Sequence, residues 1–139
     1  MCKKILSACL SVLFLTVLLS VPALAAVQAS DQIRSWNTAV TATTNGQIAI
    51  YFTVDGTRLM DTIGAQEIKV YKYLGTQWHL MHTYTQDDEG MTASQAYWYE
   101  NTIYHQGTAA DTYYIEVTIF AENSAGSDSR TEGHYVTAR

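Results

Sequence analysis

DTYYIEVTIFAENSAGSDSR, residues 111–130, contains the most regular strand pattern of the chain and the turn that follows it. Side chains alternate in character along it, with an apolar set made of Tyr113, Ile115, Val117, Ile119 and Ala121. A period of two residues places this set on one face of a pleated strand, and β-branched residues favour such a half-buried surface. Residues 123–127, NSAGS, then bend the chain toward a weaker strand over residues 129–138. The segment predicts a β-hairpin whose apolar face requires another layer of sheet to cover it.

Further short strands are expected on the N-terminal side of this hairpin. Asn45-Gly46, the strongest hairpin signal in the sequence, separates strands predicted over residues 35–43 and 47–55. Other strands are predicted over residues 67–74, 78–85 and 97–105, with an ambiguous short candidate over residues 91–96. The pattern of about seven short strands between turns predicts an all-β, antiparallel two-sheet sandwich.

Residues 56–64, GTRLMDTIG, form the longest stretch without a clear period. We expect a connection here, in which Leu59, Met60 and Ile63 form one helical turn at the end of the sandwich.

The N-terminal 25 residues have the organisation of a secretory signal peptide. Lys3 and Lys4 precede an apolar run over residues 5–21, and Ala23-Leu24-Ala25 supplies the small residues that a signal peptidase requires. We place cleavage after Ala25, with Ala29 as the second choice and a retained N-terminal anchor as the alternative. The sequence therefore predicts a secreted protein with a flexible segment over residues 26–34 and a β-sandwich domain over residues 35–139.

Cysteine and charge content narrow the classes of partner. Cleavage removes Cys2 and Cys9, so the processed chain is expected to have no disulfide and no thiolate metal site. Loss of Lys3 and Lys4 leaves six basic against thirteen acidic residues, a net charge of −7. An acidic chain without a basic cluster repels phosphate backbones, so neither nucleic acid nor, after cleavage, a membrane is an expected partner.

The central strand and its turn resemble a known domain family. The series Ile115-x-Val117-x-Ile119-x-Ala121-x-Asn123-x-x-Gly126 is similar to the penultimate strand and turn of fibronectin type III domains. The chain departs from that family at Ile115, where the family has tyrosine, and at Phe52, which takes the place of a tryptophan. The resemblance implies an immunoglobulin-like, fibronectin type III-like sandwich.

A second resemblance covers nearly the whole predicted domain. Its blocks, in this order, are Asn45-Gly46, Ile48-x-Ile50-x-Phe52-x-Val54, Met60-Asp61-x-Ile63-Gly64-Ala65, Ile68-x-Val70-Tyr71, Trp78 and Gly126-Ser127-Asp128-Ser129-Arg130. They resemble an uncharacterised family of small secreted proteins of Gram-positive bacteria. This resemblance implies secretion and a single β-domain, and it implies no activity.

Residue patterns typical of catalytic or metal-binding sites are weak in this sequence. His79 and His82 are three apart, which on a regular strand places them on opposite faces, unable to chelate together. The acidic run Asp87-Asp88-Glu89 lacks the alternating ligands of a calcium loop and is better explained as a solvated turn. The serines of residues 124–129 lack the G-x-S-x-G pattern of a hydrolase nucleophile. We therefore expect no catalytic residue, no metal, no cofactor and no enzymatic activity.

Aromatic side chains are the most suggestive candidates for a binding site. They are Tyr71, Tyr73, Tyr97, Trp98 and Tyr99. Rings exposed on a sheet stack on sugars or anchor a protein partner, whereas rings facing inward pack in the core. The sequence alone leaves both roles open. We expect a non-enzymatic extracellular binding module for a protein partner, with a small carbohydrate-binding protein as the alternative.

Overall fold

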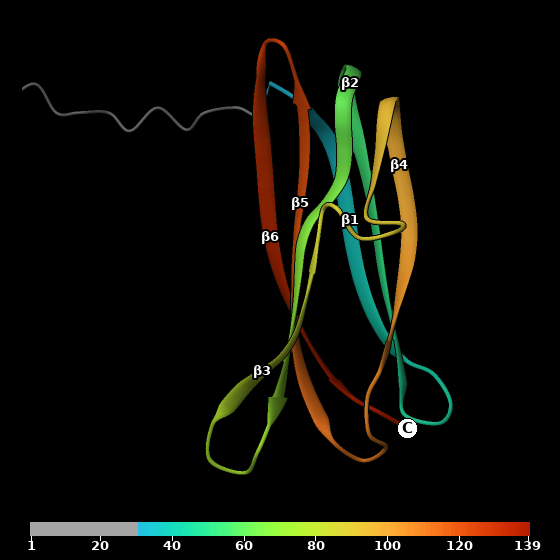
Figure 1. The fold of residues 1–139 in the computed structure, drawn as a ribbon, viewed down its shortest axis with the longest axis vertical. Coiled ribbons are helices and arrows are strands. Elements are labelled where there is room, and N and C mark those ends of the chain that lie inside the picture. Colours follow the sequence, from blue (N-terminus) through green and yellow to red (C-terminus); the bar gives the residue numbers. More distant parts are fainter. Residues whose placement is uncertain (1–30) are drawn as a thin grey trace, which may run out of the picture.

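A computed structural model describes residues 31–139, and this part of the chain is all-β (Figure 1). The strands are β1 (Ile33–Ala42), β2 (Gln47–Tyr73), β3 (Trp78–Thr85), β4 (Thr92–Gln106), β5 (Thr112–Asn123) and β6 (Gly126–Thr137). All pairings between them are antiparallel, and they join into one hydrogen-bonded sheet. The all-β, antiparallel prediction is therefore confirmed.

Of the two predictions on the N-terminal part, the structure bears only on the flexible segment. The predicted signal peptide, residues 1–25, lies outside the described residues, as do residues 26–30. β1 begins at Ile33, which is 6% exposed, so the last residues of the expected flexible segment belong to the strand. Within residues 31–139, no helix has the length and apolar character needed to cross a membrane.

β2 organises the sheet because its two halves have different neighbours. Ile50, in the first half, pairs with Val40 of β1 on one side and Ile103 of β4 on the other. Val70, in the second half, pairs with His82 of β3 and Ile115 of β5. β6 extends the sheet beyond β5. The sheet consequently curls around the apolar side chains of its inner face.

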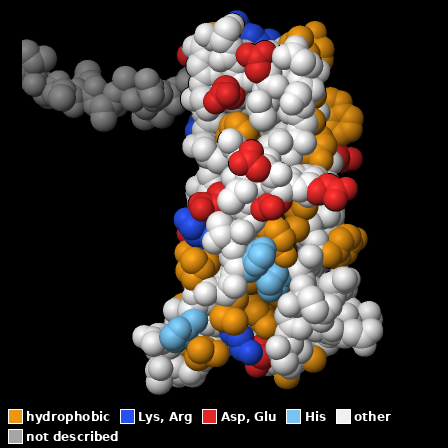
Figure 2. All heavy atoms as spheres, viewed as in Figure 1, with side chains coloured by type: hydrophobic (Ala, Val, Ile, Leu, Met, Phe, Trp, Pro, Cys, Tyr) orange, Lys and Arg blue, Asp and Glu red, His pale blue; other side chains and the backbone are white. Residues whose placement is uncertain are grey.

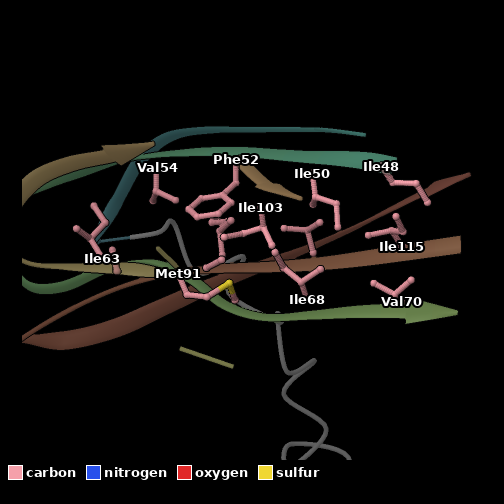
Figure 3. Close-up of a cluster of buried hydrophobic side chains, with 14 of the residues drawn as sticks. Ile48, Ile50, Phe52, Val54, Ile63, Ile68, Val70, Met91, Ile103 and Ile115 are labelled. Carbon is pink, nitrogen blue, oxygen red and sulfur yellow. The ribbon is translucent and has the colours of Figure 1, made fainter. Parts of the chain in front are cut away.

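The core lies inside this curl. Figure 3 shows Ile48, Ile50, Phe52 and Val54 of the first half of β2 pointing toward Ile68 and Val70 of the second half. All six side chains are completely buried. The predicted inner face of β5 is confirmed, since Tyr113, Ile115, Val117, Ile119 and Ala121 are all buried. Phe120, on the opposite face, is also buried and lies beside Gly64 in the register, where no side chain competes for the space.

The expected helical turn in residues 56–64 is wrong, because this segment continues β2 as extended chain. Met60 and Ile63 are fully buried whereas Leu59 is 42% exposed. The pairing with β4 shifts register between Asp55 and Met60, and such an irregularity breaks the alternation by which a strand is recognised. Residues 92–106 also form a single strand. The described chain therefore has six strands where about seven were predicted.

β1 and β6 meet through side chains on the open side of the curl. Thr38 of β1 is 6% exposed, and its hydroxyl donates a hydrogen bond of 2.6 Å to Glu132 of β6. The same hydroxyl lies 2.7 Å from Nε2 of His134. Immediately before β1 begins, the backbone N–H of Gln32 donates to the carboxylate of Asp128 at 2.7 Å. Polar side-chain bonds, rather than a backbone ladder, close this side of the molecule.

The predicted Asn45-Gly46 hairpin is confirmed between β1 and β2. Both residues have positive φ angles, 58° for Asn45 and 79° for Gly46. These are the angles that a tight hairpin turn requires and that this residue pair tolerates.

Candidate functional site

Five aromatic rings gather on the outer face of the second half of β2 and of β3, β5 and β6. We call this set the aromatic face; it consists of Tyr71, Tyr73, Trp78, Tyr114 and Tyr135. Ring centroids lie 4.9 Å apart for Tyr114 and Tyr135, and 5.1 Å apart for Tyr73 and Trp78. Trp78 also approaches Tyr135, at 5.7 Å. The rings therefore form one continuous cluster.

The register of the sheet produces this cluster from residues far apart in sequence. Tyr71 is the Cα partner of Tyr114, which in turn is the partner of Tyr135. Tyr73 is the partner of Trp78 across the turn that joins β2 to β3. Directly paired residues project to the same side of a sheet, so each strand contributes a ring to the same surface.

A glycine on β6 makes room for the middle of the cluster. A Cβ placed on Gly133 would meet the ring carbon Cε2 of Tyr114 at 2.7 Å. The ring of Tyr114 thus lies over the backbone of the neighbouring strand, a position that only glycine at residue 133 leaves free. Glycine weakens a strand interior, and a covering aromatic ring restores packing there.

The aromatic face is accessible, and it is not flat. The exposed fractions are 71% for Tyr135, 43% for Tyr73 and 39% for Trp78. Neighbouring ring planes are inclined by 38° between Tyr71 and Tyr114 and by 60° between Trp78 and Tyr114. Partial burial, followed by the charge of Glu116, raises the pKa of Tyr114, so its phenol stays protonated at neutral pH. The five rings are uncharged, their polar groups are the phenolic hydroxyls and the indole N–H of Trp78, and the charge of Glu116 lies close to Tyr114.

The five predicted aromatic residues separate into two places. Tyr71 and Tyr73 belong to the aromatic face, whereas Tyr97, Trp98 and Tyr99 lie on β4. Tyr97 and Trp98 are exposed, at 63% and 57%. Tyr99 is half-buried against the core, with its ring 6.0 Å from Phe52 and its hydroxyl donating to the carbonyl of Gly90 at 3.0 Å. No ring contact within residues 31–139 joins these three to the aromatic face.

Sequence reasoning missed Trp78, Tyr114 and Tyr135 as members of the site. Each was visible as an aromatic residue on a predicted strand, but nothing local indicates which strands are neighbours. The useful signal was the alternation of residues 113–121, because Tyr114 falls between the apolar positions Tyr113 and Ile115 and therefore on the outer face.

The prediction that His79 and His82 lie on opposite faces is wrong. Val70 pairs with His82 and Tyr71 pairs with Leu80, so Met81 is an extra residue on β3. This bulge reverses the alternation and puts His79, which pairs with Lys72, on the same face as His82. Within residues 31–139, no group of three or more His, Cys, Asp or Glu side chains is placed to hold a metal ion.

His82 instead approaches His105 of β4. Their ring centroids are 6.0 Å apart, and the hydroxyl of Tyr84 lies 3.0 Å from Nδ1 of His105. Burial is the main cause that lowers the pKa of His105, and the charge of His82 adds to it.

In the acidic turn, the carboxylate of Asp88 accepts a hydrogen bond of 2.7 Å from the backbone N–H of Thr85. That bond supports the turn itself.

No protein-family model matches the chain, and no curated protein matches it. Among solved structures, Spo0M, a sporulation control protein from Bacillus subtilis, aligns with a TM-score of 0.44 and 10% sequence identity. The alignment covers 76% of this chain and 49% of that chain, so the present sequence spans about half the length of Spo0M.

Proposed function

We propose that this protein is a secreted, non-enzymatic binding module that uses the aromatic face to bind a protein partner. The observation that carries the proposal is the continuous cluster of Tyr71, Tyr73, Trp78, Tyr114 and Tyr135, with Tyr135 71% exposed. Tyrosine and tryptophan are the residues that most often dominate the binding energy of protein interfaces. Exposure of so many neighbouring rings lowers solubility, and exposed apolar patches of this kind mark interaction sites.

The shape of the surface favours a protein over a glycan. Coplanar exposed rings would offer a flat platform to a sugar, whereas rings of the aromatic face are inclined by 38° to 60°. The cluster also reaches β3, whose one paired neighbour within the described residues is β2. Open backbone groups beside an aromatic surface suit a partner that contributes its own strand or loop. Carbohydrate binding remains the alternative function and is an outcome of the test below.

The finer description of the fold is part of the same proposal. The two layers of an immunoglobulin-like sandwich would be β1, the first half of β2 and β4 on one side, and β3, the second half of β2, β5 and β6 on the other. The pairings support this division, because the two halves of β2 have separate partner strands except near residues 60–64. The resemblance to small secreted proteins of Gram-positive bacteria and the predicted signal peptide support secretion.

Binding of the purified protein to fractionated extracellular material of the producing organism tests the function. Tyr73→Ala and Tyr135→Ala remove exposed rings of the aromatic face, and Tyr104→Ala removes a 59% exposed tyrosine of β4 as the matched control. We expect saturable binding that weakens about 30-fold in either aromatic-face variant, which is the loss of about 2 kcal/mol typical of an interface anchor. Tyr104→Ala should bind as the unaltered protein does.

Treatment of the target fraction separates the two classes of partner. Protease digestion should abolish binding, and periodate oxidation of glycans should leave it unchanged. The reverse result would establish the carbohydrate alternative. Equal binding by all three variants would refute the assignment of the site.

A further inference from the structure

β3 connects the aromatic face to the histidine pair of His82 and His105. Trp78, at its beginning, contacts Tyr73, Tyr114 and Tyr135 on the outer face. On the inner side, His82 and Tyr84 contact His105 of β4. None of the eight residues of β3 is fully buried, and the strand pairs only with β2 within the described chain. Few buried contacts hold this strand, which makes it a part of the sheet that opens easily.

The histidine pair links β3 to β4 where the two strands share no backbone ladder. The ring of His82 is 4.3 Å from that of Tyr84 and 6.0 Å from that of His105. Tyr113 of β5 packs against His105, with ring centroids 6.3 Å apart. Figure 2 shows histidine side chains set among hydrophobic ones on the lower half of one face of the molecule, with most acidic side chains gathered on the upper half.

Within residues 31–139, the groups in contact with His105 include no carboxylate that could neutralise a proton on it. They are Tyr84 from β3, Tyr113 from β5, and Ile48, the register partner of His105, from β2. Asp88 acts on Tyr84 and, after burial, helps to raise the pKa of that phenol. On β2, Lys72 is paired with Asp111 at 2.5 Å, so its charge is already balanced. A proton added to His105 therefore meets the imidazole of His82 and the phenols of Tyr84 and Tyr113.

We propose that protonation of His105, whose ring contacts those of His82 and Tyr84, loosens β3 from β4 in mild acid and, by displacing Trp78, releases the partner from the aromatic face. The regulation of binding rests on the proposed function, whereas the coupling between the histidine pair and Trp78 is a property of the free protein. The lowered pKa of His105 agrees with this arrangement, since the folded contact favours the neutral ring.

The coupling is tested by NMR on the unliganded protein between about pH 8 and 5, below which carboxylates titrate. Tryptophan occurs at residues 36, 78 and 98, so the indole N–H of Trp78 can be followed beside two internal references. We expect the Trp78 resonance to shift with the same midpoint as the imidazole protons of His105, below the ordinary value of about 6.5. The resonance of Trp36, on β1, should not shift with that midpoint.

Variants assign the response to the pair. His105→Gln keeps a hydrogen-bonding group for Tyr84 and should abolish the shift of Trp78. His82→Gln, at an exposed position, should reduce it and is the second variant if His105→Gln does not fold. His79→Gln is the matched control, because His79 lies on the same face of β3 and makes no ring contact with the pair. It should retain the full shift.

Two results would overturn the inference: a Trp78 resonance that does not change with pH, or a change that persists in His105→Gln. Neither result bears on whether the aromatic face binds a partner, which the tyrosine variants decide separately. If binding is found, its Kd should rise at least tenfold from pH 7.5 to 5.5 and stay constant in His105→Gln. If the Trp78 resonance shifts with pH but the Kd does not, the regulation of binding would be refuted and the coupling would stand.

Discussion

The ring of Tyr114 lies over Gly133, so that the smallest possible side chain at residue 133 would overlap it. The contact joins β5 to β6 at the centre of the aromatic face, because Tyr114 also packs on Tyr135 and Trp78. Glycine at this position is therefore required for the arrangement of the rings.

Gly133→Ala should displace the Tyr114 ring without removing an aromatic residue. The ring is free to swing outward, so we expect a stability change within about 1 kcal/mol, as for a surface substitution. The NMR shifts of the Tyr135 and Trp78 rings should change clearly. In a Tyr114→Ala background, Gly133→Ala should no longer affect these rings. An equal effect in both backgrounds would contradict the proposed contact.

Gly64→Ala should be much more damaging than Gly75→Ala. Both glycines have positive φ angles, 147° and 84°, but a Cβ at residue 64 would overlap the carbonyl oxygen of Met91, whereas nothing lies within 4 Å at residue 75. Backbone strain and overpacking together predict a loss of about 3 kcal/mol or more at Gly64 and about 1 kcal/mol at Gly75. Urea denaturation measures both. Similar losses would mean that β2 does not approach Met91 this closely.

Thr38→Val tests the closure between β1 and β6. The substitution keeps the shape and removes the bonds to Glu132 and His134, which predicts a loss of about 1–2 kcal/mol in the free energy of unfolding. Thr131→Val is the control, because its hydroxyl bonds Thr118 at 2.9 Å on the exposed surface. That change should cost less than about 0.5 kcal/mol. A Thr38→Val protein as stable as the control would show that the closure contributes nothing.

The free energy of unfolding should fall as the pH falls below about 6.5, the ordinary pKa of histidine. Burial and His82 lower the pKa of His105 in the folded chain, so in this range the unfolded chain binds more protons and is favoured by acid. Above this range both states have a neutral His105 and the effect disappears. Urea denaturation at about pH 7.5 and 5.5 should show a smaller difference for His105→Gln than for the unaltered protein. An identical stability difference in the two proteins would show that His105 does not cause the loss of stability in acid.

Much of the fold could be predicted from sequence because most strands alternate regularly. The inner face of β5 and the Asn45-Gly46 turn depend only on local side-chain period and on backbone angles that these residues tolerate. Residues 56–64 could not be recognised as strand, because the bend that carries β2 from one set of partners to another interrupts the alternation. The bulge at Met81 misled the assignment of His79 for the same reason.

The candidate site was predictable only in part, since it is a product of register. Tyr71 and Tyr73 were identified, but their neighbours Trp78, Tyr114 and Tyr135 come from three other strands. Tyr99 shows the opposite error, because its place in an aromatic run gave no sign that it packs on Phe52. A single sequence contains the residues of such a surface without the pairing that assembles them.

The continuity of β2 has a consequence for how the molecule assembles. The hairpin with β1 involves residues close together in sequence. In contrast, Gln47 at the beginning of β2 pairs with Gln106, and Lys72 near its end pairs with Tyr113. Contacts between residues so far apart in sequence form slowly, so the chain is expected to fold slowly and as one cooperative unit. A single cut within β2 would therefore affect β1, β3, β4 and β5 together and leave no independently folded fragment.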